Sequence, residues 1–174
     1  MTPPSASAVQ RAPSVEFHRI VGADQLLQRV QAIHENIANR ANEIARTHGH
    51  KRGYEPEEWL QAQSEFLRPV PVEIEELAEI LKLRATVLGF EQNELEVSIE
   101  PARIVIAGKK ERQPEEGNKL FYVDWGPDEI CEVVHLPSEI KPALAEIKFH
   151  AGVLEFDLLK SEGFPEWTTR IMED

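Results

Sequence analysis

The sequence has very little cysteine and no long hydrophobic run. Cys131 is the only cysteine among 174 residues, so no internal disulfide can form and nothing points to an oxidising compartment. No apolar run approaches the ~20 residues that a membrane span requires. Residues 1–14 are rich in proline, serine and alanine and contain no hydrophobic segment of the secretory kind. These absences predict a cytoplasmic protein.

Positive charge is scarce as well. The chain has 19 lysines and arginines against 31 aspartates and glutamates, which gives a formal net charge of −12. Such a field repels the phosphates of nucleic acids and anionic lipids, so we expect no nucleic-acid partner and no membrane partner. The same charge would help to keep a protein soluble while it exposes apolar surface.

The first part of the chain predicts helices behind a disordered arm. Residues 1–20, with their scattered prolines, cannot build a core. From residue 23 to residue 48, apolar side chains recur at helical spacing, at Leu26, Val30, Ile33, Ile37 and Ile44. A second helix begins near Pro56 and carries Trp59. The pattern predicts an α-helical hairpin domain over residues 21–68, with Trp59 packed on the apolar stripe of the first helix.

Beyond Pro69 and Pro71 the hydrophobic spacing changes from the helical period to alternation. Short runs of alternating apolar and polar residues are typical of half-buried strands. The predicted strands cover residues 80–87, 95–99, 103–106, 120–123, 130–136, 144–149 and 153–159. Glycines and prolines separate them at the spacing of turns. The chain is therefore predicted to be mainly β, with an immunoglobulin-like antiparallel β-sandwich domain over residues 69–160 and a flexible tail over 161–174.

Motifs for nucleotide binding and for nucleophilic catalysis are absent from the sequence. Gly108-Lys109-Lys110 lacks the upstream glycine and the serine or threonine of a phosphate-binding loop. Cys131 and His135 lie four residues apart on one predicted strand, about 13 Å from each other, which is too far for a thiolate–imidazole pair. Cys131 is better explained as a small core or edge residue. We expect no enzyme and no cofactor.

Three histidines lie in or near the predicted helical turn. His48 and His50 are in the turn itself, and His34 lies earlier on the first helix. A histidine pair can contribute to a zinc site, but tetrahedral sites use three or four ligands. We interpret these histidines as solvated turn residues and expect no metal.

Four segments of the second half match one family pattern, in order and at compatible spacing. They are Ala85-Thr86-Val87-Leu88-Gly89-Phe90-Glu91-Gln92-Asn93-Glu94-Leu95, Ile104-Val105-Ile106-Ala107-Gly108-Lys109, Val134-His135-Leu136-Pro137 and Ala151-Gly152-Val153-Leu154-Glu155-Phe156. With them, residues 70–160 resemble the α-crystallin (Hsp20-like) domain of the small heat-shock proteins. The signature residues are Gly89, Gly108, Leu136, Pro137, Gly152, Val153 and Leu154. The resemblance implies a chaperone that works without ATP and forms dimers that assemble into larger oligomers.

The chain also departs from that family pattern. Glu132 stands where the family usually has an arginine, and Ala151 stands where it usually has asparagine or aspartate. The usual Ile-x-Ile/Val hook of the C-terminal tail is missing, and Ile171 stands beside Met172 instead.

The resemblance further implies a groove for partners. The strands at residues 95–99 and 144–149 are expected side by side at one edge of the sandwich. Four apolar residues would line a groove there that accepts the hook of another chain or contacts clients: Val97, Ile99, Ile147 and Phe149. The alternative is that these four are ordinary core residues, and exposure distinguishes the two. The segments that could fill the groove are Val15-Glu16-Phe17, Val70-Pro71-Val72 and the tail residue Ile171.

The helical hairpin resembles a short bacterial domain of unknown function over residues 37–66, from Ile37-Ala38 to Pro56-Glu57-Glu58-Trp59-Leu60. This resemblance implies no mechanism. The stripe from Leu26 to Ile44 is a candidate helix-pairing surface for client or oligomer contacts.

Two functions remain from different classes. The first is a holdase that binds partly unfolded proteins, prevents their aggregation and self-associates. The second is a specific protein-docking module or co-chaperone with the same sandwich, which the missing tail hook and Glu132 favour.

Overall fold

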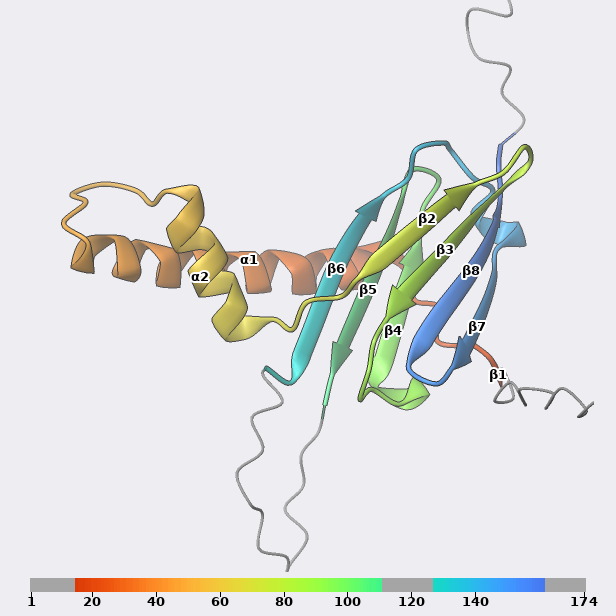
Figure 1. Ribbon diagram of the computed structural model, residues 1–174, viewed down its shortest axis with the longest axis horizontal. Helices are drawn as coiled ribbons and strands as arrows, with labels where there is room; N and C mark the ends of the chain where they lie inside the picture. The colour runs from red at the N-terminus through yellow and green to blue at the C-terminus, as the bar shows by residue number, and fades with distance from the viewer. Residues whose placement is uncertain (1–14, 111–126, 162–174) are drawn as a thin grey trace, which may run out of the picture.

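The computed structural model describes residues 15–110 and 127–161. Two antiparallel sheets form a β-sandwich, and a helical hairpin extends away from it (Figure 1). The elements are β1 (Val15–Glu16), α1 (Ala23–Thr47), α2 (Pro56–Phe66), β2 (Val72–Glu76), β3 (Ile80–Thr86), β4 (Leu95–Ile99), β5 (Arg103–Lys109), β6 (Glu129–His135), β7 (Glu146–His150) and β8 (Val153–Leu159), with 3-10 turns at Gln92–Glu94 and Pro142–Leu144. The predicted fold class, an antiparallel sandwich preceded by a helical hairpin, is confirmed.

The sandwich consists of a five-stranded sheet in the order β1-β7-β8-β3-β2 and a three-stranded sheet in the order β4-β5-β6. The strands alternate as half-buried strands should. On β8, Leu154, Phe156 and Leu158 are buried, and Phe156 pairs with Leu83 of β3. Side chains from both sheets fill one core between the layers.

β1, β2 and β5 differ from the sequence prediction, and β1 lies in the segment predicted to be a disordered arm. β2 was not predicted, because Pro69 and Pro71 mark a boundary and hide the short alternation that follows; it pairs with β3 along its whole length. β5 was predicted to be half-buried and is buried on both faces, with Val105 and Ala107 on the side away from the sandwich core. The predicted strand at 120–123 lies outside the described residues.

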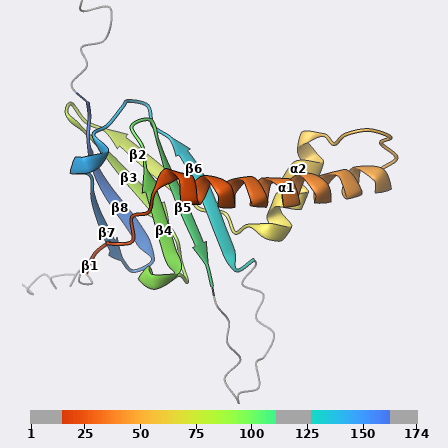
Figure 2. The same ribbon diagram turned by 180° about the vertical axis from the view of Figure 1, so that it is seen from behind.

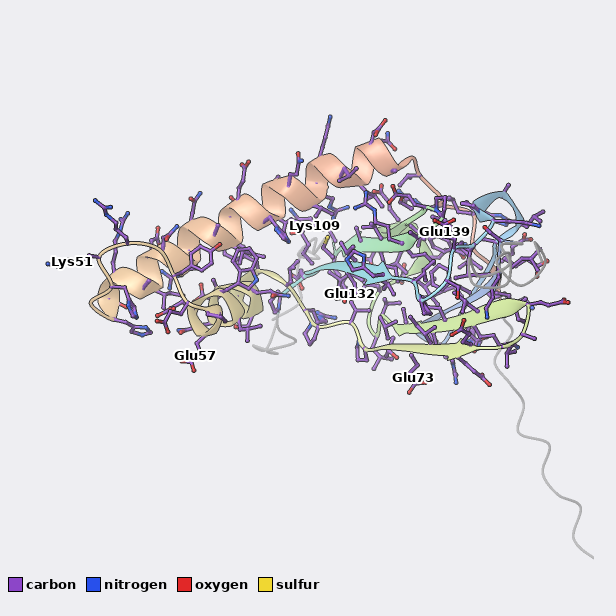
Figure 3. All side chains as sticks on the ribbon, turned by 90° about the horizontal axis from the view of Figure 1, so that it is seen from above. Lys51, Glu57, Glu73, Lys109, Glu132 and Glu139 are labelled. Carbon is purple, nitrogen blue, oxygen red and sulfur yellow. The ribbon has the colours of Figure 1, made fainter. Side chains whose placement is uncertain are left out.

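β5 is buried on both faces because α1 packs on its outer face. Figure 3 shows three layers, with α1 over the three-stranded sheet and the five-stranded sheet beyond it. Leu26 of α1 packs on Val105 and Ala107. Arg29 forms ion pairs with Glu96 of β4 at 3.7 Å and with Glu129 of β6 at 3.3 Å, so its guanidinium bridges the two outer strands across β5.

The second half of α1 packs against α2. Ile33, Ile37, Ala41 and Ile44 form a cluster with Ala62 and Leu67, and Trp59 and Phe66 pack on it. The prediction that Trp59 packs on the stripe is confirmed. The stripe is not a free pairing surface, however, because the sheet covers its first turns and α2 covers the rest. No helix within the described ranges is long and apolar enough to span a membrane.

Candidate partner-binding groove

The four predicted groove residues lie along one side of the sandwich. β4 and β7 belong to opposite sheets; β4 is the edge strand of its sheet on this side, and β7 would be the edge strand of the other sheet if β1 were absent. Val97 and Ile147 are buried, with 0% and 3% of their surface exposed. Ile99 and Phe149 are half-buried and pack against the same core.

Residues 15–21 cover this side of the sandwich, and we call them the N-terminal strap. Figure 2 shows the strap running from β7 to the start of α1. β1 pairs with β7, with Val15 opposite Phe149 and Glu16 opposite Lys148. The strap then crosses to the other sheet, where Ile20 forms a parallel bridge with Val97.

Backbone hydrogen bonds hold the strap to both sheets. The N–H of Phe17 donates to the carbonyl of Ile147 at 2.9 Å. The N–H of Val21 donates to the carbonyl of Val97 at 2.9 Å, and the N–H of Val97 donates to the carbonyl of Arg19 at 3.2 Å. The edges of β4 and β7 are therefore paired with the chain's own N-terminal segment.

Phe17 anchors the strap. Its side chain is 3% exposed and belongs to the core cluster that contains Val97 and Ile147. Polar contacts at the rim add to this: Gln92 donates from Nε2 to the carbonyl of Glu16 at 3.0 Å, and Arg19 donates to the carbonyl of Asn93. Residues 15–20 were expected to be part of a disordered arm; they are ordered because Phe17 buries an aromatic ring and the backbone finds two edges to pair with.

The other two candidate segments for the groove have different positions. Val70 is buried in the core and Val72 begins β2, so the candidate segment Val70-Pro71-Val72 is part of the sandwich itself. The tail candidate Ile171 lies outside the described residues, as does Met172.

The signature residues around Gly152 form the tight turn between β7 and β8. His150 pairs with Val153, so Ala151 and Gly152 are the only loop residues. Both have positive φ, 46° and 74°, which is the type I′ geometry that two-residue hairpins favour. A Cβ on Gly152 would lie 3.2 Å from the Cα of Leu88, so glycine is needed for space as well as for conformation.

The other signature residues occupy comparable positions. Gly89 has φ 86° in the turn after β3. Gly108 lets Leu95, Phe90 and Ile130 close over β5, since a Cβ there would approach Leu95 within 2.9 Å. Leu136 is half-buried against the core, and Pro137 follows it just after β6.

Glu132 and Cys131 lie on opposite faces of β6. Ile130 and Val134, the neighbours of Glu132 on its face, point into the sandwich core, and burial raises the pKa of the Glu132 carboxyl. Figure 3 labels Glu132 on this strand. Cys131 faces the helices and packs against the hairpin cluster, and burial raises its pKa to about 11. A thiol with that pKa is no nucleophile at neutral pH.

The turn histidines have carboxylate neighbours that the sequence interpretation left out. His48 and His50 both face the carboxylate of Glu58, which is 4% exposed. Glu55 joins the cluster. The signal was the spacing His48-x-His50 followed by Glu55 and Glu58, which becomes visible once the second helix is known to fold back over the turn.

Comparison with known proteins identifies the sandwich. The model of the Hsp20/alpha crystallin family matches residues 73–172, more than half of the chain. Solved structures similar to the chain include heat shock protein 16.0 from Schizosaccharomyces pombe, with 18% identity over 57% of this chain and 96% of that one and a TM-score of 0.46. A small heat-shock protein from Xylella fastidiosa has 17% identity over 57% and 93%, with a TM-score of 0.46. The small heat shock protein AgsA from Salmonella typhimurium has 19% identity over 57% and 96%, with a TM-score of 0.44.

No curated protein matches the chain. The family match covers β2 to β8, the strands that build the sandwich and the groove. Proteins of this family are chaperones without enzymatic activity. The chain belongs to the Hsp20/alpha crystallin family, the small heat-shock proteins.

Proposed function

We propose that the protein is a cytoplasmic holdase that binds partly unfolded proteins without ATP and keeps them from aggregating. The observation that carries the proposal is the side of the sandwich between β4 and β7. Apolar side chains line it, and the cover is a short segment held by one buried ring and a few backbone hydrogen bonds. A segment held in this way can detach by local unfolding while the rest of the fold stays intact.

Displacement of the strap would expose both an apolar strip and two unpaired strand edges. Extended, apolar segments of unfolded proteins bind such edges by strand addition, with backbone hydrogen bonds for affinity and alternate side chains in the strip. The groove residues Val97, Ile99, Ile147 and Phe149 would then contact clients in place of Phe17. The net charge of −12 would keep the complex soluble.

The test is light scattering of a heat-labile protein, with no ATP present, using the full chain and the variants Phe17→Ser and His18→Ser. We expect the full chain to suppress scattering near stoichiometric ratios. Phe17→Ser should suppress it at lower ratios because the strap has lost its anchor. His18→Ser changes an exposed neighbour and should match the unmodified chain. Thermal unfolding would verify that both variants remain folded.

Two results would count against the proposal. If neither the full chain nor Phe17→Ser suppresses aggregation, the holdase is wrong. If both suppress it equally, the chain is a holdase whose clients bind elsewhere.

Self-association is proposed at the opposite side of the sandwich. β2 and β6 are the outer strands there, and unpaired edges are common places of strand addition. Ile74 and Leu77 are 38% and 39% exposed beside that edge, so a second copy would also cover apolar surface. Sedimentation of Ile74→Lys against the unmodified chain should show a shift toward monomer.

A docking module for one specific partner is the second candidate. The strap favours the docking module, because it occupies the groove that would otherwise accept the tail hook of a neighbouring chain. A monomer or dimer without aggregation suppression would support this candidate.

A further inference from the structure

The turn between α1 and α2 brings together nitrogen and oxygen ligands from both helices. One ligand atom each of His50, Glu55 and Glu58 lies within 4.8 Å of the other two. Nε2 of His50 is 3.2 Å from Oε1 of Glu58, and Nδ1 of His48 is 3.3 Å from the same oxygen. Figure 3 labels Lys51, the residue after His50, at the end of the hairpin away from the sandwich.

Glu58 is fixed before any ligand arrives. Its side chain is 5% exposed, and its Oε2 accepts the N–H of Glu55 at 2.6 Å in the capping box that starts α2. Oε1 therefore remains for a cation or for the histidine rings.

The charge of Glu58 has little compensation. Among the described residues, its ion-pair partners are the two histidines, and no lysine or arginine pairs with it. An imidazole balances the charge of the carboxylate only when it is protonated. A buried carboxylate beside imidazole nitrogens is a favourable place for a divalent cation.

The backbone of the turn holds His50 in position. Gly49 and Gly53 have φ values of 87° and 73°, left-handed conformations that glycine adopts readily, and they flank the turn that places His50 beside Glu58. The His50 side chain is 40% exposed, which leaves the cluster open to solvent on one side.

We propose that this cluster is a Zn²⁺ site, with His50, Glu55 and Glu58 as protein ligands and water in the open position. Zinc bonds of 2.0–2.2 Å place neighbouring tetrahedral ligands roughly 3.3–3.6 Å apart. The His50–Glu58 separation already has nearly that value, and the Glu55 ligand atom lies within 4.8 Å of both, while its carboxylate also accepts the backbone N–H of Glu58 in the capping box. Imidazole with carboxylates suits zinc, whereas Mg²⁺ and Ca²⁺ use oxygen ligands alone.

Bound zinc would tie the end of α1 to the start of α2. The metal would balance the Glu58 charge and close the hairpin at its outer end, far from the groove. His48 would keep its hydrogen bond to Glu58 and orient that carboxylate.

The test is calorimetric titration of the full, untagged chain with Zn²⁺ and with Mg²⁺ at pH 7.5, together with Co²⁺ absorption spectroscopy. We expect one Zn²⁺ per chain, no Mg²⁺ binding, a tetrahedral Co²⁺ spectrum and a higher melting temperature with zinc. His50→Ala and Glu55→Gln should each weaken zinc binding at least tenfold. His135→Ala, at an exposed position on β6, should leave it unchanged.

The proposal is overturned if the chain binds no zinc stoichiometrically, or if His50→Ala and Glu55→Gln bind zinc as tightly as the unmodified chain. Circular dichroism of both variants at pH 7.5 shows whether the hairpin remains helical, so that loss of the site is separated from loss of the fold. Neither result depends on chaperone activity.

Discussion

At the residue scale, the turn between β7 and β8 contains a conformational misfit. Ala151 has φ 46°, a left-handed conformation that costs an alanine about 1 kcal/mol or more. Asparagine tolerates this conformation much better, and it is favoured at the first position of a type I′ turn. The departure from the family pattern noted at Ala151 therefore has a physical cost.

Ala151→Asn should stabilise the folded chain by about 0.5–1 kcal/mol, because it relieves that misfit without touching the core. Urea denaturation would measure the change. Ala143→Asn, at an exposed position with ordinary φ, is the matched control and should have no such effect. Equal stability of Ala151→Asn and the unmodified chain would contradict the assignment of the turn.

Glu132 makes stability depend on pH. Burial raises its pKa above the ordinary 4.5, so between these two values the folded chain holds a proton that the unfolded chain has released. This contribution to stability therefore falls as pH rises through that window, and the full cost remains at neutral pH. Glu132→Gln should raise the melting temperature at pH 7.5 and have a smaller effect at pH 4. The exposed Glu139→Gln is the control, and a larger gain at pH 4 than at pH 7.5 would refute the argument.

At the element scale, α1 packs both on the three-stranded sheet and on α2. Its first turns cover β5 through Leu26, and its second half forms the hairpin core with α2. The helical hairpin is therefore attached to the sandwich by packing as well as by its linker. The ion pairs of Arg29 with Glu96 and Glu129 fix the direction in which the helix crosses the sheet.

Leu26→Ala should destabilise the chain by about 2–5 kcal/mol, because it opens a cavity between α1 and β5 at a fully buried position. Leu60→Ala removes the same side chain from a position on α2 that is 64% exposed and should change stability by less than about 0.5 kcal/mol. Urea denaturation compares the two. Similar losses would mean that α1 does not depend on the sheet for its stability.

The elements that could be predicted from the sequence are those with a clear hydrophobic periodicity along the chain. The helical stripe and the alternation of β8 follow from neighbours along the chain, and so does the turn at Gly152. What could not be predicted depends on packing between distant segments. The second buried face of β5 exists only because α1 lies on it, although the continuous apolar run from Ile104 to Ala107 was a hint.

The groove illustrates the same limit. The four groove residues and the strap segment were both visible in the sequence, but alternation cannot tell a lining residue from a core residue. The difference is decided by which segment covers the edge. Likewise, the cluster around Glu58 needed the fold of the hairpin before its ligands could be counted.

At the scale of the whole molecule, net negative charge opposes association between copies of the chain. The formal charge is −12 at pH 7 and the isoelectric point is near 5.0. Repulsion between like-charged chains opposes association at neutral pH and fades as pH approaches that value.

Solubility should therefore pass through a minimum near pH 5, and particle size should grow between pH 7 and pH 5 in low salt. Dynamic light scattering across this range measures the effect, and return to pH 7 should reverse it. A size that does not change across the range would show that charge does not limit association.

The position of the strap also has a consequence for synthesis. Phe17 is translated well before its hydrogen-bond partner Ile147. Until β7 has been translated, Phe17 has no complete pocket to enter, whereas α1 and α2 can pair at once. The nascent chain would thus expose the Phe17 ring until β7 has been made, and the strands that cover the strap are translated after it.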